Sequence, residues 1–538
     1  MKLDKIQLPV TNRLYTDYVT NSENIAPFFH YTVEADAFEK RAQYLQAQTY
    51  NYQELARVIE QYMERFGITQ AVQHHIADLR EGALAIVGGQ QAGILTGPLY
   101  SVHKAITVIL LAKQQSAKLG KKVVPIFWIA GEDHDIEEIN HTYTNVDYVL
   151  KKRAYSERTA KKYMASNAVY DRNIMKKTFS QIFADFGETE YTASLLEEVL
   201  QFVDSNETFT QLFTAMMNDL FGKHGLLMID AANPKFRQFE TVYFERLIEN
   251  SHQIAQVVVE QEQELEAAGY TKPIFATASN SNLFYVKDGE RHLLEWRDGF
   301  AQNDAAHVKF TKDELLQIAK HTPEQLSNNV VTRPLMQEMT IPVLAFVGGP
   351  GELAYWATLK PAFEQLKLQM PIFTPRLHVS FVTRQTQSLL EQLEHSVEQV
   401  FTKQLQQSLD AFIESVQDKE AVVTIDMMEQ QMKAQYQVLQ AQLQASQLNL
   451  EEIVATNEAY HTKQFDYLKQ KIAQQVLQKH QVKIRQYNTI QLELLPNGGL
   501  QERVYNPYMF MNVYGKSLVD DVLKTDIEIT TEHQVLYF

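Results

Sequence analysis

The chain has 538 residues, of which 45% are hydrophobic and 11% aromatic, and its formal net charge at pH 7 is −16. This length exceeds that of a single hydrophobic core, so the sequence predicts a folded protein of about two to four domains. The negative charge disfavours a nucleic-acid partner, because an acidic surface repels phosphate backbones. The sequence contains no cysteine, which excludes disulfides, zinc–thiolate sites and a thiol nucleophile.

Two features of the sequence bear on the cellular location of the protein. The N-terminal residues include no apolar segment typical of a secretory signal. The most apolar stretches, near residues 105–112 and 123–130, are far shorter than the roughly 18 residues that span a bilayer. We therefore expect a cytoplasmic protein without a membrane partner. The most basic run, within residues 151–162, is interpreted as a solvated loop or an anion-docking insertion, in preference to a nucleic-acid site.

The N-terminal residues lead into the stretch around which the chain is organised. Residues 1–80 are expected to be mostly helical, because apolar and aromatic residues recur at three- and four-residue spacings. The apolar run Ala83–Val87 then predicts a buried strand. Gly88 and Gly89 end this strand, and a loop leads to a helix that Pro98 can begin.

A strand, a glycine-rich turn and a helix N-terminus together favour anion binding, because unpaired backbone N–H groups point toward the ligand. The motif is weakly specified, since it is not GxGxxG and Gly97 is followed by Pro98 where a P-loop has lysine. A ligand-binding turn is our preferred interpretation. A tight turn whose glycines only relieve backbone crowding is the alternative.

Four more apolar runs predict strands further along the chain. They do not alternate with polar residues, which is typical of strands covered by helices on both faces. The runs are Val123–Ala130, Leu226–Asp230, Ile341–Val347 and Ile372–Thr374. We therefore predict an α/β fold class with a Rossmann-like, doubly wound core over residues 81–379.

Two gaps between these strands are too long for a single crossover helix. We expect an inserted subdomain in each, at about residues 140–224 and 235–335. In the second insertion, the apolar runs Ser281–Val286 and His292–Trp296 flank Asp288-Gly289, which predicts a β-hairpin.

The composition changes at about residue 380, where glycine and proline disappear until about 485. Apolar residues at helical spacing form two seams around a turn at Ser446–Leu450, which predicts a helical hairpin or coiled coil. The seam residues are Met428, Met432, Tyr436, Leu439 and Leu443, then Phe465, Leu468, Ile472 and Val476. A lone hairpin exposes an apolar stripe, so we expect a homodimer formed through this segment. The tail, residues 486–538, is expected to pack back on the core.

In open α/β sheets ligands bind beyond the carboxyl ends of the strands, so the residues that follow each strand are the site candidates. Glu132-Asp133-His134-Asp135 follow the second strand and can hold an ammonium group, accept its proton or bind Mg²⁺. An acidic helix start is the alternative, and a zinc site is less favoured.

Three further features follow or precede strands. Gly348–Glu352 is a candidate anion or substrate loop, and a plain strand-to-helix turn is the alternative. Arg333 and Arg376 can each bind a carboxylate through two hydrogen bonds, or form a structural ion pair. His103 is either a functional residue or a core histidine.

Four segments carry a resemblance to a known family: VGGQQAGILTGPLYSVHK, PIFWIAGEDHDIEEIN, SNNVVTRPLMQE and FVGGPGELAYW. Together they resemble the bacillithiol-biosynthesis cysteine-adding enzyme family, and the resemblance extends over nearly the whole chain, including Gln501-Glu502-Arg503. It implies a Rossmann-type core with two connecting insertions and a C-terminal coiled coil that makes the dimer. It also implies a ligase that joins the cysteine carboxyl to the amine of glucosaminyl-malate, the last step of bacillithiol biosynthesis.

The resemblance leads to roles for individual residues. A carboxylate is a poor electrophile, so we expect activation with ATP, with Mg²⁺ as a further candidate. Amine binding and deprotonation are assigned to Glu132, Asp133, His134 and Asp135. The acyl or phosphate side is assigned to Gln90, Gln91, Thr96, His103 and Lys104, with His103 also counted as catalytic. Arg333 is assigned to the malate carboxylates, and Gly349, Glu352 and Arg376 to further substrate contacts. Gly88, Gly89, Arg503 and Asn506 are the candidate nucleotide contacts, and no metal ligand is assigned.

Other functions stay open at this point. The core is loosely similar to class I nucleotidyl-transferases, in which paired histidines on a glycine-rich turn bind ATP, but only His103 is present here. A glycosyl- or nucleotidyl-transferase is therefore one rival, and a nucleotide-binding coiled-coil scaffold without catalysis is another. Hydride transfer is disfavoured because GxGxxG is absent.

Overall fold

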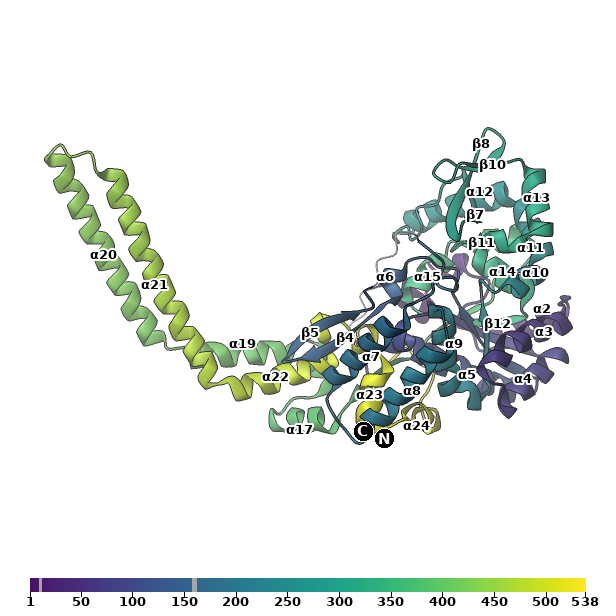
Figure 1. Ribbon diagram of the computed structural model, residues 1–538, viewed down its shortest axis with the longest axis horizontal. Helices are drawn as coiled ribbons and strands as arrows, with labels where there is room; N and C mark the ends of the chain where they lie inside the picture. Colours follow the sequence, from purple (N-terminus) through teal and green to yellow (C-terminus); the bar gives the residue numbers. More distant parts are fainter. Residues whose placement is uncertain (9–11, 157–161) are drawn as a thin grey trace. The chain divides into compact units, whose positions relative to one another are not determined.

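The computed structural model describes residues 1–8, 12–156 and 162–538. The chain divides into two compact units, Met1–Thr383 together with Gly498–Phe538 as unit 1, and Arg384–Asn497 as unit 2 (Figure 1). None of the helices in the described ranges is long and apolar enough to cross a membrane.

Unit 1 is built on a sheet of five parallel strands in the order β13-β12-β2-β3-β6. The strands are β2 (Leu84–Gln90), β3 (Val123–Ile129), β6 (Leu227–Asp230), β12 (Val343–Gly348) and β13 (Ile372–Pro375). All five were predicted, because their apolar runs are buried on both faces. The helix α5 (Leu99–Leu119) packs on β2 and β3. The predicted α/β, Rossmann-like class is confirmed.

The order of the strands creates a switch point in the middle of the sheet. From β2 the chain continues on one side through β3 and β6, and it returns on the other side of β2 through β12 and β13. The carboxyl ends of β2 and β12 are therefore followed by connections that lead in opposite directions. Diverging connections leave a crevice at this point, and open α/β sheets bind their ligands in such a crevice.

Between β3 and β6, the described residues form the short helix α6 (Ile136–Ile139), a hairpin and three longer α-helices. The hairpin and the longer helices are β4 (His141–Val146), β5 (Val149–Ala154), α7 (Arg172–Phe186), α8 (Thr192–Ser205) and α9 (Phe209–Phe221). The basic run begins on β5, where Arg153 pairs with Asp185 at 2.5 Å. Residues 157–161 of that run lie outside the described residues.

The segment between β6 and β12 contains a second, antiparallel sheet in the order β10-β9-β8-β7-β11. Its strands are β7 (Asn280–Lys287), β8 (Glu290–Arg297), β9 (Phe300–Asn303), β10 (Val308–Phe310) and β11 (Leu326–Asn328). The predicted hairpin is confirmed as β7 and β8, whose turn residues Asp288 and Gly289 both have positive φ. The helices of this segment are α10 (Pro234–Phe239), α11 (Thr241–Glu249), α12 (Ser251–Ala267), α13 (Lys312–His321) and α14 (Thr332–Thr340).

The two ends of the chain meet in a third sheet. Strand β1 (Lys2–Ile6) pairs with β15 (His533–Tyr537), which also pairs with β14 (His378–Val382). The helices α1 (Arg13–Val19), α2 (Ala37–Gln46), α3 (Tyr52–Met63) and α4 (Gln70–Arg80) match the expected helical segment. The β1 strand was missed. The unit is completed by α6 (Ile136–Ile139), α15 (Pro350–Trp356), α16 (Lys360–Gln365), α23 (Pro507–Tyr514) and α24 (Leu518–Lys524).

Unit 2 is helical and contains the predicted hairpin. Helices α20 (Lys419–Ala445) and α21 (Glu451–Lys479) lie side by side (Figure 1). Lys469 links them through ion pairs to Asp426 at 2.6 Å and Glu429 at 3.0 Å. The turn between the helices lies at 446–450, as predicted. The other helices are α17 (Arg384–Gln392), α18 (Val397–Phe401), α19 (Gln404–Val416) and α22 (Gln481–Leu494).

Two details of unit 2 differ from the prediction. The predicted seam residues Met428, Leu439 and Leu468 are 48%, 41% and 42% exposed. Met432 and Tyr436 are half-buried, and the Tyr436 hydroxyl contacts His461 of α21 at 2.7 Å. The apolar residues therefore form an inner seam and an outer, exposed stripe. In addition, the helical unit extends to residue 497, because α22 packs on α17 and α19, and the part of the tail that belongs to unit 1 begins at 498.

Candidate functional site

A cavity of about 640 Å³ opens at the switch point of the parallel sheet. Residues 89–91 at the end of β2 line one side, and residues 349–352 after β12 line another. Phe284, Arg291 and Leu293 of the inserted sheet form part of the wall. The whole cavity lies within unit 1.

The structure brings ten of the seventeen predicted site residues to this cavity. They are Gly89, Gln90, Gln91, Lys104, Asp133, Arg333, Gly349, Glu352, Arg376 and Arg503. The other seven are described by the structure but do not line the cavity. They are Gly88, Thr96, His103, Glu132, His134, Asp135 and Asn506.

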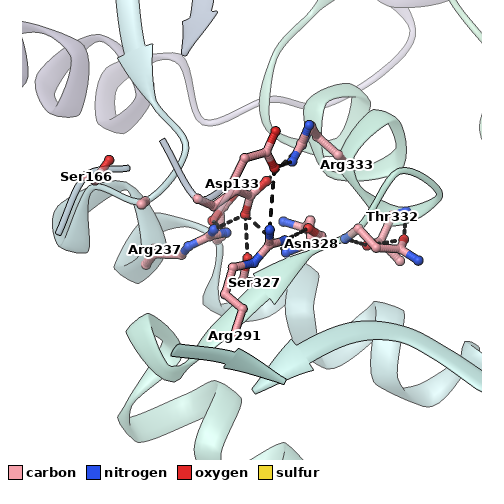
Figure 2. A network of polar contacts seen from close by, with 12 residues as sticks. Asp133, Ser166, Arg237, Arg291, Ser327, Asn328, Thr332 and Arg333 are labelled. Atoms are coloured by element: carbon pink, nitrogen blue, oxygen red, sulfur yellow. Dashed lines mark hydrogen bonds and ion pairs between the residues drawn. The ribbon is translucent and has the colours of Figure 1, made fainter. Parts of the chain in front are cut away.

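Glu132 follows β3 and is a fully buried carboxylate surrounded by hydrogen-bond donors, among them Arg237, Ser327 and Arg333, which Figure 2 labels. Its Oε2 accepts from the Arg237 guanidinium, from Ser327 Oγ at 2.8 Å and from the Asn328 amide at 3.2 Å. Its Oε1 accepts from Arg333 Nε at 2.8 Å. Burial alone would raise the pKa of Glu132, but Arg237, Arg333 and other nearby donors lower it to about 2. This bonding favours a structural anchor over the predicted proton acceptor, and the role of Glu132 in amine binding stays a prediction.

Asp133 and Arg333 continue this network to the cavity wall. Arg333 Nη2 donates to Asp133 Oδ1 at 2.6 Å, so the guanidinium bridges Glu132 and Asp133 (Figure 2). Arg333 was predicted to hold the substrate's malate carboxylates. Two of its three nitrogens are used by the protein, which leaves Nη1 for a ligand.

Lys104 is an almost fully buried ammonium group on α5 whose Nζ ties together the loops after β2 and β12. It donates to the Gly89 carbonyl at 2.6 Å, to Gln90 Oε1 at 3.0 Å and to Glu352 Oε2 at 2.7 Å. Glu352 also accepts from the Gly349 amide at 2.8 Å. Burial lowers the pKa of Lys104, and Glu352 acts in the opposite direction. The two predicted substrate loops are therefore joined by one ion pair at the cavity.

The tail contributes a second buried carboxylate, Glu502. The Arg376 guanidinium donates to its two oxygens at 3.0 and 2.7 Å. His378 Nδ1 and His103 Nδ1 lie 3.0 and 3.3 Å from the same carboxylate. Burial alone would raise the pKa of Glu502, but Arg376 and His378 hold it well below its usual range. His103 is fully buried in this cluster, so the core-histidine alternative describes it, and the predicted catalytic role is corrected.

The other predicted residues outside the cavity have local roles. Asn506 is fully buried and caps α23, because its Oδ1 accepts from the Tyr508 and Met509 amides at 2.9 and 3.3 Å. Its Nδ2 donates to Thr142 Oγ1 at 2.8 Å, so the side chain has a structural role outside the cavity, and the nucleotide assignment stays a prediction. Thr96 is buried, and its hydroxyl donates to the neighbouring backbone carbonyl at 2.7 Å.

His134 and Asp135 complete the acidic motif without reaching the cavity lining. His134 is half-buried beside the Phe284 ring, at 6.2 Å between centroids. Burial and the charge of Arg291 lower the pKa of His134. Asp135 is exposed and directly precedes α6, as the helix-start alternative proposed.

The glycine-rich turn differs from the expected anion site. The Leu99 amide at the start of α5 donates to the Tyr505 carbonyl of the tail at 2.8 Å, and the Ser101 amide donates to Pro98 at 2.9 Å. A Cβ on Gly88 would lie 2.7 Å from Val108 Cγ2, and one on Gly89 would lie 2.4 Å from the Trp128 carbonyl oxygen. Close packing therefore explains both glycines, as the alternative interpretation held.

The charge of the cavity identifies the class of ligand that it fits. Among the described residues that line it, Lys104, Arg291, Arg333, Arg376 and Arg503 are cationic. The lining carboxylates among them are Asp133 and Glu352. Five cations line the cavity against two anions, in a chain whose net charge is −16, although Arg333 and Arg376 also pair with the buried carboxylates Glu132 and Glu502. This contrast favours an anionic ligand.

The structure does not favour a metal held by the protein alone. Within residues 1–8, 12–156 and 162–538, no group of three or more histidine, aspartate or glutamate side chains is placed to hold a metal ion. At the acidic motif, the arginine network occupies Glu132 and one oxygen of Asp133.

Sequence reasoning missed several residues of the cavity wall, above all Arg291. It lies two residues after the hairpin turn, where a charged residue is normally solvated, and only the packing of the inserted sheet against the core buries it. Tyr100, Gln337 and Tyr355 also line the cavity. Each lies on a helix next to a segment that was predicted, but the helical spacing alone does not show which face meets a ligand.

Comparison with known families accounts for nearly the whole chain. The family profile described as "Bacillithiol biosynthesis BshC, N-terminal Rossmann-like domain" matches residues 1–377. The profile described as "Bacillithiol biosynthesis BshC, C-terminal coiled-coil domain" matches residues 379–538. The chain belongs to the BshC family. The predicted family, its Rossmann-like core and its C-terminal coiled coil are thereby confirmed.

BshC relatives align along the full chain. A protein of Lysinibacillus sphaericus is 52% identical over 537 residues, and one of Geobacillus kaustophilus is 38% identical over 541 residues, covering 100% of both chains in each case. A protein of Staphylococcus carnosus is 33% identical over 486 residues, which is 90% of each chain. All three carry the name "Putative cysteine ligase BshC". These names place the chain among ligases.

Proposed function

We propose that this chain joins cysteine to glucosaminyl-malate through an amide bond, completing bacillithiol. The observation that carries the proposal is the cavity at the switch point, where two carboxylates and five cationic side chains face one space of about 640 Å³. An acidic amine substrate and an activated carboxyl group both find partners of opposite charge in such a cavity. The family name of the relatives supplies the reaction class.

The amine side of the reaction is assigned to the two carboxylates of the cavity. Asp133 uses Oδ1 for Arg333, and Glu352 uses Oε2 for Lys104 and the Gly349 amide. Each keeps a second oxygen that can hold the substrate ammonium and take one of its protons. The neutral amine then attacks the activated carbonyl carbon and the C–N bond forms. The nitrogen gives its second proton to the other carboxylate, and the activating group leaves with the electron pair of the C–O bond.

The acyl side is assigned to the cations Lys104, Arg376 and Arg503. Phosphate groups carry several negative charges, and these side chains supply compensating positive charge. The N-terminus of α5 is not available for this purpose, because its Leu99 amide is already bonded to Tyr505. We therefore propose ATP as the activating co-substrate. Mg²⁺ would then arrive with the nucleotide phosphates, which supply oxygen ligands of their own.

The exposed stripe of unit 2 supports a homodimer as a further part of the proposal. Val438, Leu439, Tyr467 and Leu468 on α20 and α21 are each 41–55% exposed. Apolar residues at helical spacing on paired helices are stabilised when a second copy covers them. The cytoplasmic location expected from the sequence stays a prediction.

Calorimetry separates this ligase from a nucleotide-binding scaffold. The ligase binds cysteine and glucosaminyl-malate saturably, and Lys104→Met weakens the binding of ATP without abolishing that of glucosaminyl-malate. A scaffold binds nucleotide but neither of the other two substrates. Saturable binding of nucleotide alone would therefore refute the proposed function.

A further inference from the structure

Arg291 on β8 has few partners for a guanidinium that is almost completely buried. Only 4% of its side chain is exposed. Its Nη2 donates to the Asn328 carbonyl at 2.7 Å, but its Nη1 lies 3.4 Å from Asp133 Oδ1, which is a long contact (Figure 2). Its Nε has no hydrogen-bond partner among the described residues. The guanidinium carbon lies 4.0 Å from the centroid of the Phe284 ring.

The neighbouring arginines are much better satisfied. Arg237 contacts Glu132 and, at 2.8 Å, Glu240, and Arg333 contacts Glu132 and Asp133 at 2.8 and 2.6 Å. Burial raises the pKa of Glu240, and its ion pair with Arg237 acts in the opposite direction. Three guanidiniums and three carboxylates meet in this network, and the contact of Arg291 with Asp133, at 3.4 Å, is the longest of its ion pairs.

A second unsatisfied group lies beside Arg291. The Asn328 side chain is fully buried, and neither its Oδ1 nor its Nδ2 has a hydrogen-bond partner in the part of the chain that the structure describes. Its backbone carbonyl is the one that Arg291 contacts. Buried polar groups without partners cost stability, so each one calls for an explanation, such as a bound water, an ion or a ligand.

We propose that Arg291 binds a carboxylate of the amine substrate, so that the inserted sheet supplies the anion-recognition residue of the cavity. Both Arg291 and Phe284 line the cavity, and the Phe284 ring holds the guanidinium plane while shielding it from water. The unbonded Nε and the terminal nitrogens form the fork that a carboxylate fits. This inference rests on the proposed function. Arg291, together with Nη1 of Arg333, then selects an amine that bears malate over a glucosamine derivative without carboxylates.

The test compares three variants of the full chain by calorimetry. Arg291→Met removes the fork, Arg291→Lys keeps the charge without it, and Arg297→Met is the matched control. Arg297 lies on the same strand, half-exposed and paired with Glu295 and Asp304. The probes are glucosaminyl-malate, free malate as a dicarboxylate, and glucosamine as an amine without carboxylates.

We expect Arg291→Met to weaken the binding of glucosaminyl-malate and of malate by about 10- to 100-fold, the range for a charge-assisted pair. The binding of glucosamine stays unchanged, Arg291→Lys gives an intermediate loss, and Arg297→Met matches the wild type. The thermal midpoint of Arg291→Met stays at the wild-type value, because the guanidinium forms only one short bond within the protein. A purely structural arginine would instead lower that midpoint.

The outcomes separate this inference from the proposed function. Malate binding that is independent of Arg291, or an equal loss for malate and glucosamine, overturns the carboxylate subsite even if the enzyme makes product. Malate binding that depends on Arg291 without any product supports the subsite and overturns the ligase. If the wild type binds neither malate nor glucosaminyl-malate, the subsite is refuted. If Arg291→Met does not fold, Arg291→Lys takes its place in the test. A ratio of malate affinity to glucosamine affinity below that of the wild type supports the subsite, and an unchanged ratio overturns it.

Discussion

Replacing Glu132 with glutamine tests whether this residue anchors the site or acts in catalysis. The change keeps the shape of the side chain and removes its charge. Glu132 accepts four hydrogen bonds, three on Oε2 and one on Oε1. A glutamine amide N–H₂ group would face a guanidinium donor in place of one of these oxygens. Breaking a buried ion pair in this way costs about 3–5 kcal/mol.

The lowered pKa of Glu132 gives a second value for the contribution of this carboxylate to the free energy of unfolding. Its pKa falls from the usual 4.5 to about 2 on folding. At about 1.4 kcal/mol per pH unit, this difference corresponds to about 3 kcal/mol. Because the folded pKa is the lower one, the contribution is complete above about pH 4.5 and is lost as the pH falls toward about 2. The difference in stability between wild type and Glu132→Gln is therefore constant from pH 7 to about 5 and shrinks below about 4.5.

Urea unfolding followed by tryptophan fluorescence measures this difference. The three tryptophans, Trp128, Trp296 and Trp356, all lie buried in unit 1, so the signal reports that unit. The control Glu137→Gln, an exposed carboxylate five residues along, should change stability by less than about 0.5 kcal/mol. If Glu132→Gln kept wild-type stability while activity fell more than about 100-fold, Glu132 would be a catalytic base and the anchoring role would be refuted.

Three further predictions follow from the same structure. Lys104→Met should lower kcat/KM for ATP about 100-fold, and an unchanged value in steady-state assays would exclude Lys104 from the acyl side. Glu502→Gln should destabilise unit 1 by about 3 kcal/mol at pH 7 and expose residues 498–538 to limited proteolysis, because Arg376 loses its buried partner. The pKa of Glu502 is lowered in the fold, so this loss should diminish only at acid pH, and pH-independent unfolding would contradict it. Leu468→Asp should shift the chain from dimer to monomer in sedimentation velocity, whereas an unchanged dimer would show that the stripe is not the interface.

The parallel sheet could be predicted because its signal is local. Val123–Ile129 and Val343–Gly348 are buried on both faces, so each is a continuous apolar run that ends at a glycine or a polar cluster. The β1 strand could not be predicted in the same way. Lys2–Ile6 is short and polar on most positions, and it is a strand only because it pairs with His533–Tyr537 at the other end of the chain.

The same distinction applies to the site. Strand ends pointed to Asp133, Lys104 and Glu352, because the carboxyl edge of a parallel sheet follows from topology. The roles of Glu132 and His103 did not follow, since they depend on which distant arginine or carboxylate packs against each. Arg237, more than one hundred residues after Glu132, turns that carboxylate into an anchor.

The spacing in unit 2 was also informative only in part. The helical period predicted the hairpin and its turn, but a period cannot tell the inner seam from the outer stripe when apolar residues occupy more than one face. Tyr436 bonds to His461 of the neighbouring helix, while Leu439 on the same helix as Tyr436 is 41% exposed. Which apolar residues form the inner seam depends on how the two helices of one chain contact each other, and the spacing in the sequence does not show this.

The central claim is that this cavity forms the amide bond between cysteine and glucosaminyl-malate. Mass spectrometry of a reaction with purified chain, both substrates, ATP and Mg²⁺ tests it most directly. We predict the mass of bacillithiol together with an equal amount of AMP or ADP, AMP indicating an adenylate and ADP an acyl phosphate, and strongly reduced product with Lys104→Met. Folded wild-type chain that binds both substrates but yields no product, or equal product from Lys104→Met, would contradict the account.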